Sequence, residues 1–465
     1  MMEQQLYWAS CANGLQFCLR SELEAIDGTH IVSDSIANGG VLFKTTSEPQ
    51  DLANLRSADN VYAFLGHYKD VPLDKENGLK YLSALASKID WEGSMVLHRK
   101  WQKLYDSGLR PPVDAEQEDD SDPQISFRVT GERICLKMKK QGYTSMEAAA
   151  AIGGGVHELL GWKADMRSYN VEILAWIRDM ELLLVLGLLY SNSGPKNVKE
   201  NMPWSTGSEH EAVLHDVSLH PEAVPDEATK VIPVKAPRPS RSEAQLHSRR
   251  PYRKALVGTS LKPSTAFALL QLGQIAPGHL VVDPMCGCGT IPLEAADWLK
   301  GQLMSLAGDD SLQAVDAAKN NSAGRGPGGG GPCDVLQWDA AHLPLRDGTV
   351  DRVICDMPFG NRCGNAKVRE WLCPKVVKEV VRILQPGTGI AVLMAQSKSM
   401  RREVEVIQKP FLELLQQLSI NMEGLIVDVY VLQRTMEAPP IQVFYPGKKN
   451  RKRSRTVSNS SVGLI

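Results

Sequence analysis

Apolar and polar positions along the chain mark out three ordered stretches, and the first covers about residues 1–110. Strand-like runs begin near Leu6 and Gly39, and the segment 15–26 between them has apolar residues at helical spacing. This alternation of strand and helix in a short span predicts a small ferredoxin-like unit. The acidic segment 111–124 that follows carries almost no apolar residue and is typical of a solvated loop.

The second ordered stretch covers residues 125–190. It opens on a strand, continues through an alanine-rich helix at 145–161 and ends in two strongly apolar strands within 170–190. Residues 191–248 are rich in Pro, Ser, Glu and His and show no sustained periodicity. A segment of that length without periodicity predicts a linker or an insertion rather than part of a core.

Strand and helix patterns alternate repeatedly in the third ordered stretch, residues 249–440. The expected strands lie at 279–284, 305–310, 333–339, 352–358, 389–396 and 427–434, with helices at 292–302, 312–321 and 374–384. Such alternation predicts a parallel sheet with helices on both faces, as in Rossmann-like folds. Residues 441–465 form a basic, serine-rich tail, for which a nuclear localisation signal, an RNA-binding arm and a nonspecific disordered tail all stay open.

The overall composition is that of an ordinary globular protein and narrows the function only slightly. The formal net charge of −2 argues against a uniformly basic nucleic-acid binder but leaves room for a local basic face. The cysteines mostly stand singly in apolar contexts, and Cys286 and Cys288 lack the paired spacing of a zinc site, so no metal and no disulfide framework is expected. The absence of a secretory signal and of a membrane-length apolar run predicts a cytoplasmic protein, with a nuclear location also open.

A glycine turn between a strand and a helix is the sharpest motif. The strand that ends at Asp283 breaks into a loop carrying Gly287 and Gly289 before the next helix. Asp283 is expected at the carboxyl edge of the sheet, and the glycines allow the backbone to approach a ligand closely. A bare Gly-x-Gly also fits a tight strand–helix turn, so the loop alone decides nothing.

Acidic residues at the ends of the next two strands favour a nucleoside cofactor. Asp309 can accept both hydroxyls of a ribose, and the neighbouring Asp310 can do the same. Asp339 can accept from an adenine amino group while an apolar neighbour packs on the ring. Because Pro292 occupies the third glycine position of a dinucleotide motif, the loop suits S-adenosylmethionine (AdoMet) better than a nicotinamide dinucleotide.

The strand end at Asp356 carries the candidate chemistry. An exocyclic amine is a poor nucleophile because its lone pair is delocalised into the base ring. Asp356 and the carbonyl of Met357, aimed by the rigid Pro358, would accept hydrogen bonds from such an amine, and Phe359 would stack on the base. This is catalysis by orientation and electrostatic stabilisation. An ordinary Asp-Pro turn is the structural alternative.

These motifs resemble a known family. Segments 283–296 and 356–360 are similar to the methyltransferase domain of THUMP-domain-containing RNA (guanine-N2)-methyltransferases. The segment 161–165 and the units before it resemble a THUMP domain, and the first 75 residues resemble its ferredoxin-like partner. About three quarters of the chain is covered by the resemblance. It departs from the family pattern at Cys288 and Met357.

The resemblance implies a fold and a set of site residues. The fold is a Rossmann-like α/β methyltransferase domain with a mostly parallel seven-stranded sheet, preceded by an α+β module of ferredoxin-like (1–110) and THUMP (125–190) domains. By motif position, AdoMet-binding residues are Asp283, Pro284, Gly287, Gly289, Asp309, Asp339 and Thr265, and catalytic residues are Asp356, Pro358 and Phe359. The implied substrate is a tRNA guanosine, at the sixth position of the acceptor stem, and the implied partner is a small zinc-binding activator resembling Trm112.

Basic residues in and after the second stretch are the candidates for RNA binding. They are Lys137, Lys139, Lys140, Lys163, Arg167, Arg249 and Arg250. Such residues could hold phosphates of a double-stranded stem, although any one of them also fits an ordinary solvated face. Three functions follow: N2-methylation of a tRNA guanosine, the same chemistry on a small nuclear RNA guanosine or an adenine N6, and a non-catalytic RNA-binding scaffold.

Overall fold

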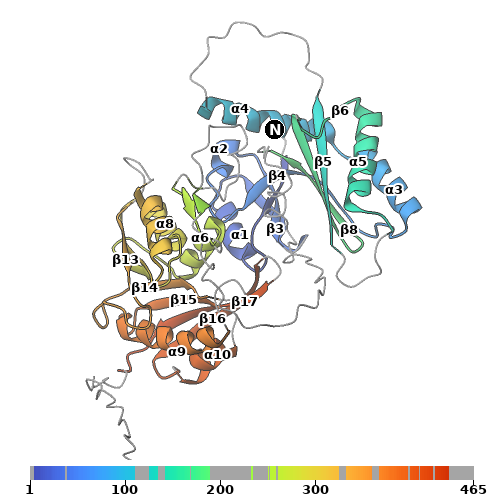
Figure 1. Cartoon of the computed structure of the whole chain (residues 1–465). Helices are drawn as coiled ribbons and strands as arrows, with labels where there is room; N and C mark the ends of the chain where they lie inside the picture. Colours follow the sequence, from blue (N-terminus) through green and yellow to red (C-terminus); the bar gives the residue numbers. More distant parts are fainter. Residues whose placement is uncertain are drawn as a thin grey trace, which may run out of the picture.

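The computed structural model consists of two units joined face to face (Figure 1). We call residues 5–188 the N-terminal unit and residues 250–438 the C-terminal unit. The structure describes residues 5–36, 39–109, 125–134, 142–167, 169–188, 232–233, 250, 252–257, 260–323, 331–358, 366–395, 398–407, 409–422 and 425–438. The expected acidic loop, most of the expected linker and the basic tail lie outside these residues.

One eight-stranded sheet runs through the whole N-terminal unit, in the order β2-β3-β1-β4-β8-β7-β5-β6. Its elements are β1 (Gln5–Ser10), α1 (Gln16–Glu24), β2 (Thr29–Ser33), β3 (Gly40–Thr45), α2 (Pro49–Leu52), β4 (Asn60–Tyr68), α3 (Lys75–Ala84), the 3₁₀ turn η2 (Leu85–Lys88), α4 (Trp91–Leu109), β5 (Ser126–Ile134), α5 (Ser145–Leu160), β6 (Lys163–Ala164), β7 (Val171–Arg178) and β8 (Glu181–Gly187). Strands β4 and β8 pair antiparallel and join the two stretches that the sequence separates.

The two stretches that β4 and β8 join also pack together. One hydrophobic core contains residues from both stretches, with Tyr7 and Val61 from the first and Ile173 and Leu184 from the second. Helices α3 and α4 belong to this core, and the sequence patterns did not single them out. Helix α5 begins with a reciprocal capping box between Thr144 and Glu147, which satisfies backbone donors at its start.

The C-terminal unit contains a seven-stranded sheet in the order β13-β12-β11-β14-β15-β17-β16. Its elements are β10 (Ala255–Leu256), α6 (Pro263–Leu272), β11 (Leu280–Asp283), α7 (Thr290–Trp298), β12 (Met304–Asp309), α8 (Leu312–Ala323), β13 (Cys333–Gln337), β14 (Arg352–Asp356), α9 (Ala366–Ile383), β15 (Ile390–Ala395), α10 (Lys398–Arg402), the π-helical η4 (Glu403–Ile407), β16 (Leu412–Met422) and β17 (Leu425–Arg434). A short strand β9 (Ile232–Pro233) pairs with β10.

The expected mostly parallel sheet is confirmed. Strands β11 to β15 pair in parallel, whereas β17 and β16 complete the sheet antiparallel. The sequence patterns did not identify β16 as a strand. Alternate residues of β14 enter two different cores: Val353 and Cys355 pack with α9, and Ile354 packs with α6. Figure 1 shows α9 and α6 on opposite sides of this sheet, so helices cover both faces.

The two units contact each other through α1 and the loop before it. Leu15 and Cys18 belong to the core that contains residues of α6. The loop also extends the C-terminal sheet locally, because Asn13 forms an antiparallel bridge with Asn421 of β16. In the described part of the chain, no helix is both long and apolar enough to cross a membrane.

Candidate functional site

Three aspartates lie at the same edge of the C-terminal sheet. Asp283, Asp309 and Asp356 end β11, β12 and β14, which are neighbours in the sheet and run in parallel. Parallel strands bring their carboxyl ends to one edge, where open α/β sheets bind ligands. The structure therefore brings together the residues that the sequence placed on separate strands.

The glycine loop is held against the second of these aspartates. The backbone N–H of Gly287 donates to Oδ2 of Asp309 over 2.9 Å, and Oδ1 of Asp309 accepts from the N–H of Ser311 at 3.0 Å. The neighbouring Asp310 is exposed. Of the two acidic residues that the sequence left open, Asp309 is thus the one that contacts the loop.

Both predicted glycines adopt backbone conformations that other residues rarely take. Gly287 has φ +53° and Gly289 has φ +81°. A Cβ atom on Gly289 would also come within 3.2 Å of side-chain carbons of Ala318 and Leu293. Gly289 precedes the first residue of α7, so the first turn of that helix and the loop amides face the strand-end edge. The sequence pattern identified this turn correctly.

Burial disfavours negative charge on the aspartates of this edge. Asp283 is buried, and its pKa is raised well above the usual range by burial and by the nearby Asp356 and Asp309, although the N–H of Met285 opposes the rise. Burial also raises the pKa of Asp309, against the backbone N–H groups that it accepts from. A buried edge with several carboxylates favours a ligand that carries positive charge.

Asp356 is the most unusual carboxylate of the three. The residue is partly exposed, but burial of its carboxyl group raises its pKa to about 8. Its Oδ1 atom is buried without a hydrogen-bond partner among the described residues. The turn after it is fixed, because the N–H of Met357 donates to the carbonyl of Met394 at 2.9 Å and Pro358 follows directly. The predicted stacking residue Phe359 lies outside the described residues.

Of the remaining predicted cofactor residues, Pro284 and Asp339 follow strand ends at this edge. The carbonyl of Pro284 accepts from Nε1 of Trp338 at 3.0 Å, which fixes the start of the loop against the residue after β13. Asp339 is exposed, and hydrogen bonding to His342 lowers its pKa. Thr265 is buried on α6, and its hydroxyl has no partner among the described residues.

The predicted RNA-binding residues are only partly supported. Lys163 and Arg167 are exposed on and beside β6, at the edge of the N-terminal sheet. Arg250 is only slightly exposed, and its guanidinium pairs with Glu294 at 2.9 Å, which disfavours the predicted contact with RNA. Such an engaged cation is not offered to a phosphate. The other predicted residues, Lys137, Lys139, Lys140 and Arg249, lie outside the described part of the chain.

The sequence reasoning also missed a buried acid. Glu294 lies on α7, one turn after the glycine loop, and has no exposure to solvent. The available signal was a carboxylate at a central position of a mostly apolar helix, whose other acid, Asp297, lies near its end; a fully buried acid needs charged partners. Its partners come from distant segments and could not be read from local spacing.

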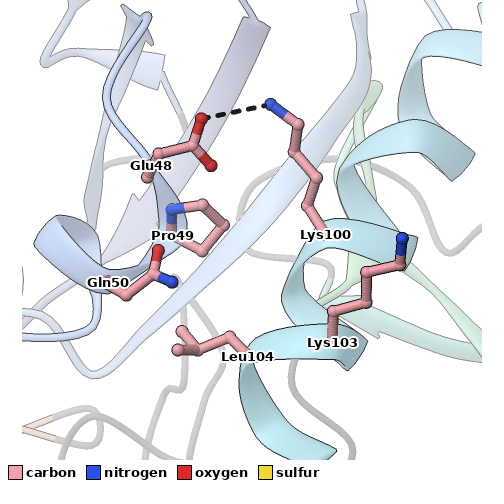
Figure 2. Close-up of a pocket in the computed structure, with 6 residues that line it drawn as sticks. All are labelled: Glu48, Pro49, Gln50, Lys100, Lys103 and Leu104. Carbon is pink, nitrogen blue, oxygen red and sulfur yellow. Dashed lines mark ion pairs between the residues drawn. The ribbon is translucent and has the colours of Figure 1, made fainter. Parts of the chain in front are cut away.

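A surface pocket exists on the N-terminal unit between α2 and α4. It is lined by Glu48, Pro49, Gln50, Lys100, Lys103 and Leu104. Figure 2 shows the two lysines projecting from α4, with Lys100 paired with Glu48 at 3.6 Å. Because these residues belong to the N-terminal unit, the pocket is separate from the strand-end edge of the other sheet.

Comparisons with known proteins place the C-terminal unit in a methyltransferase family. Residues 250–409 match the family model described as "RMKL-like, methyltransferase domain". The human tRNA (guanine(6)-N(2))-methyltransferase THUMP3 is 30% identical over 345 residues, which are 71% of this chain and 56% of that protein. The bovine U6 snRNA (guanine-N(2))-methyltransferase THUMPD2 is 26% identical over 67% of this chain and 48% of its own length. The chain thus spans only about half the length of these relatives.

Solved structures confirm the arrangement of both units. TrmN from Thermus thermophilus superposes with a TM-score of 0.58 at 21% identity, over 92% of this chain and 99% of that one. A putative methyltransferase complexed with SAH superposes with a TM-score of 0.58 at 14% identity, over 94% of this chain and all of that one. The chain is therefore similar in sequence to proteins named as RNA guanine-N2 methyltransferases, and its residues 250–409 match an RMKL-like methyltransferase domain.

Proposed function

We propose that this protein is an AdoMet-dependent RNA methyltransferase that forms N2-methylguanosine in tRNA. The observation that carries the proposal is the Asp356 carboxylate at the end of β14, whose Oδ1 atom is buried and has no partner within the described chain. A buried acceptor left unsatisfied is costly, and such groups are retained where a ligand completes them. The glycine loop and Asp309 lie at the same sheet edge.

The residues at this edge fit AdoMet. When bound, AdoMet supplies a methyl group on a positively charged sulfur. Asp309 has lone pairs left to accept from ribose hydroxyls, and Gly287 leaves space beside the loop backbone, where the nearest atom to an added Cβ would be 3.7 Å away. The exposed Asp339 can accept from the adenine amino group, and the Thr265 hydroxyl is assigned to the cofactor side on motif position alone.

Asp356 is the group that orients the nucleophile. We assign its free Oδ1 to an N–H of the exocyclic amine, so that the nitrogen lone pair faces the methyl group. The acceptor must be ionised to favour the positive charge that develops on nitrogen during transfer. A cation bound at this edge lowers the pKa of Asp356 from its value of about 8 and so favours that ionised form.

The N-terminal unit is the proposed docking site for RNA. Lys163 and Arg167 are exposed there, and their charges can contact phosphates. The names of several relatives specify the guanine at position 6 of tRNA, and we propose the same position here. A Trm112-like activator and a cytoplasmic location belong to the same proposal. Relatives named for U6 snRNA make a guanosine of that RNA the second candidate substrate.

A tritiated-methyl assay tests this function. The full chain, alone and with a Trm112-like protein, is incubated with labelled AdoMet and with purified total tRNA or U6 snRNA, and nucleosides are identified by mass spectrometry. We expect N2-methylguanosine in tRNA. Label only in U6 snRNA would select the second substrate, and N6-methyladenosine would refute guanine specificity. If no RNA is methylated and calorimetry detects no AdoMet binding, the chain is a scaffold.

A further inference from the structure

A short loop of the N-terminal unit contacts two helices of the C-terminal unit: α7, which follows the cofactor loop, and α6, which carries the predicted cofactor residue Thr265. We call residues Arg56–Asp59 the bracket loop; it directly precedes β4. The guanidinium of Arg56 contacts two acids of α7, with Nη1 at 2.8 Å from Glu294 and Nη2 at 2.7 Å from Asp297. Planar two-armed contacts of this kind fix direction as well as distance.

The acid at the centre of this contact is fully buried. Glu294 accepts from Arg56, from the guanidinium of Arg250 and from the hydroxyl of Tyr252 at 2.7 Å. The Arg250 guanidinium also donates to the backbone carbonyl of Arg56 at 3.2 Å. The network therefore joins the N-terminal unit, the entry to the C-terminal unit and α7. Helix α7 begins directly after Gly289 of the cofactor loop.

The other end of the bracket loop holds the start of α6. Asp59 is buried and accepts from Nζ of Lys262 at 3.3 Å and from the hydroxyl of Ser264. The next residue, Thr265, is a proposed cofactor residue. The two ends of one loop thus contact two different elements of the cofactor site.

The bracket loop is itself fixed within the N-terminal unit. The carboxylate of Glu22 on α1 accepts from the backbone N–H of Arg56 at 3.0 Å and from the N–H of Ser57 at 2.7 Å. At the other end, the N–H of Asp59 donates to the carbonyl of Ser10 at 2.7 Å. A displacement of the N-terminal sheet is therefore transmitted to the loop.

We infer that the bracket loop aligns the N-terminal unit with the methyl-transfer site, so that RNA docked on that unit presents its target base to Asp356. This inference rests on the function proposed above. The apolar contact through Leu15 and Cys18 holds the units together without fixing a direction, whereas buried ion pairs specify one relative orientation. Arg56 and Asp59 are positioning residues, because neither touches the strand-end edge.

The test distinguishes a loss of alignment between the two units from a loss of AdoMet or tRNA binding. Arg56→Ala leaves Glu294 paired with Arg250 and Tyr252, so the variant keeps a compensated buried charge. We expect the single-turnover transfer rate at saturating tRNA to fall about 10- to 100-fold, the range expected for a misplacement of about 1 Å. The AdoMet Kd from calorimetry and the tRNA Kd from filter binding stay within about threefold of wild type, because neither surface is altered.

Companion variants sharpen the readout. Asp59→Ala should reproduce the effect of Arg56→Ala, and Arg56→Lys should retain part of the rate because one ammonium can reach one of the two acids. Arg20→Ala is the matched control, since Arg20 belongs to the same unit but makes exposed pairs with Glu24 and Asp34. We expect the control to transfer methyl groups at the wild-type rate.

A covalent link tests the role of alignment directly. Asn13 and Asn421 face each other across the two units in an antiparallel bridge. Opposed Cα atoms in such bridges lie about 4.5–5.5 Å apart, within the range of a disulfide. We expect the oxidised pair Asn13→Cys/Asn421→Cys in the Arg56→Ala background to restore the transfer rate to within about threefold of wild type, and its reduction to abolish the rescue.

The inference is overturned by an Arg56→Ala enzyme that transfers at the wild-type rate, or by one whose loss persists after the disulfide forms. A loss that merely follows a weaker AdoMet Kd would also refute it. Small-angle scattering provides a readout without activity, because Arg56→Ala should broaden the distribution of interatomic distances and the oxidised link should narrow it. If the wild-type protein methylates no RNA, the proposed function fails. The scattering result then still shows whether Arg56 fixes the relative orientation of the two units.

Discussion

The backbone N–H of Gly287 donates a hydrogen bond to the carboxylate of Asp309, over 2.9 Å, and so ties the cofactor loop to the end of the neighbouring strand. This contact distinguishes Asp309 from Asp310, which is exposed. We expect Asp309→Ala to weaken AdoMet binding about 10- to 100-fold, since it removes an ionised acceptor worth about 1.5–3 kcal/mol. Isothermal titration calorimetry measures the change. Asp310→Ala is the control, and equal losses in both variants would show that the ribose role is misassigned.

Replacing Asp356 should separate catalysis from cofactor binding. Asp356→Asn keeps the size of the side chain but cannot carry the negative charge that stabilises the reacting amine. We expect methyl transfer to tRNA to fall about 10²- to 10³-fold, as for the loss of one transition-state acceptor, while the AdoMet Kd changes little. Single-turnover assays and calorimetry give the two numbers. Loss of AdoMet binding would assign this residue to the cofactor instead.

The same residue should make stability depend on pH. The folded pKa of Asp356 is about 8, above its unfolded value of 3.8. Between these pH values the native state holds a proton that the unfolded state releases, so this group's contribution to folding stability falls as pH rises from about 4 to about 8. The free energy of unfolding of wild type, relative to that of Asp356→Asn, should therefore decrease as pH rises across this window and stay constant above it. Urea titrations at several pH values measure it, and a constant difference would contradict the raised pKa.

The glycine before Asp309 is required by a close contact. A Cβ atom on Gly308 would lie 1.9 Å from Cε2 of Trp338. We expect Gly308→Ala to lower the free energy of unfolding by about 1–3 kcal/mol, because a buried indole has to move. Gly154→Ala is the contrasting variant: Gly154 is in α5 with no atom near the added methyl group, and helix propensity predicts a gain of about 0.5–1 kcal/mol. Thermal or urea unfolding compares the two.

Exposed basic residues beside β6 should contribute to RNA affinity without affecting the fold. For the double variant Lys163→Ala/Arg167→Ala, we expect weaker tRNA binding and a salt dependence of log Kd reduced by about 2, one for each lost phosphate contact. The melting temperature should not change, because both side chains are exposed. By contrast, Arg250→Ala should lower the melting temperature, since it removes a partner of buried Glu294. An unchanged salt slope in the double variant would move the RNA-binding face elsewhere.

The local part of the site could be predicted from the sequence because it depends on periodicity. Apolar runs that end in an acid mark buried parallel strands, and parallel strands must bring those acids to one edge. Asp283, Asp309 and Asp356 were therefore predictable as a group. Strand β16 was not singled out because most of its residues are exposed and show no alternation. Helices α3 and α4 were missed although buried residues of α4, such as Trp91, Met95 and Trp101, recur at helical spacing.

The contacts between the units could not be predicted. Arg250 in sequence is simply one of several basic residues, and its role is decided by Glu294, 44 residues further along the chain. Arg56 and Glu294 are separated by 238 residues. A single sequence offers no signal that pairs residues so far apart, so Arg250 was expected at a phosphate although its guanidinium is paired with Glu294.

The pairing of β4 with β8 also constrains the order in which the chain can fold. During synthesis β1 to β4 emerge first, but β4 gains its second neighbour only when β8, ending at Gly187, has left the ribosome. Until then β4 presents an open edge to the cell, and edges of that kind recruit other strands. A fragment cut at residue 110 would keep that edge permanently. The first native-like intermediate on the ribosome is therefore expected only after about two fifths of the chain has been made.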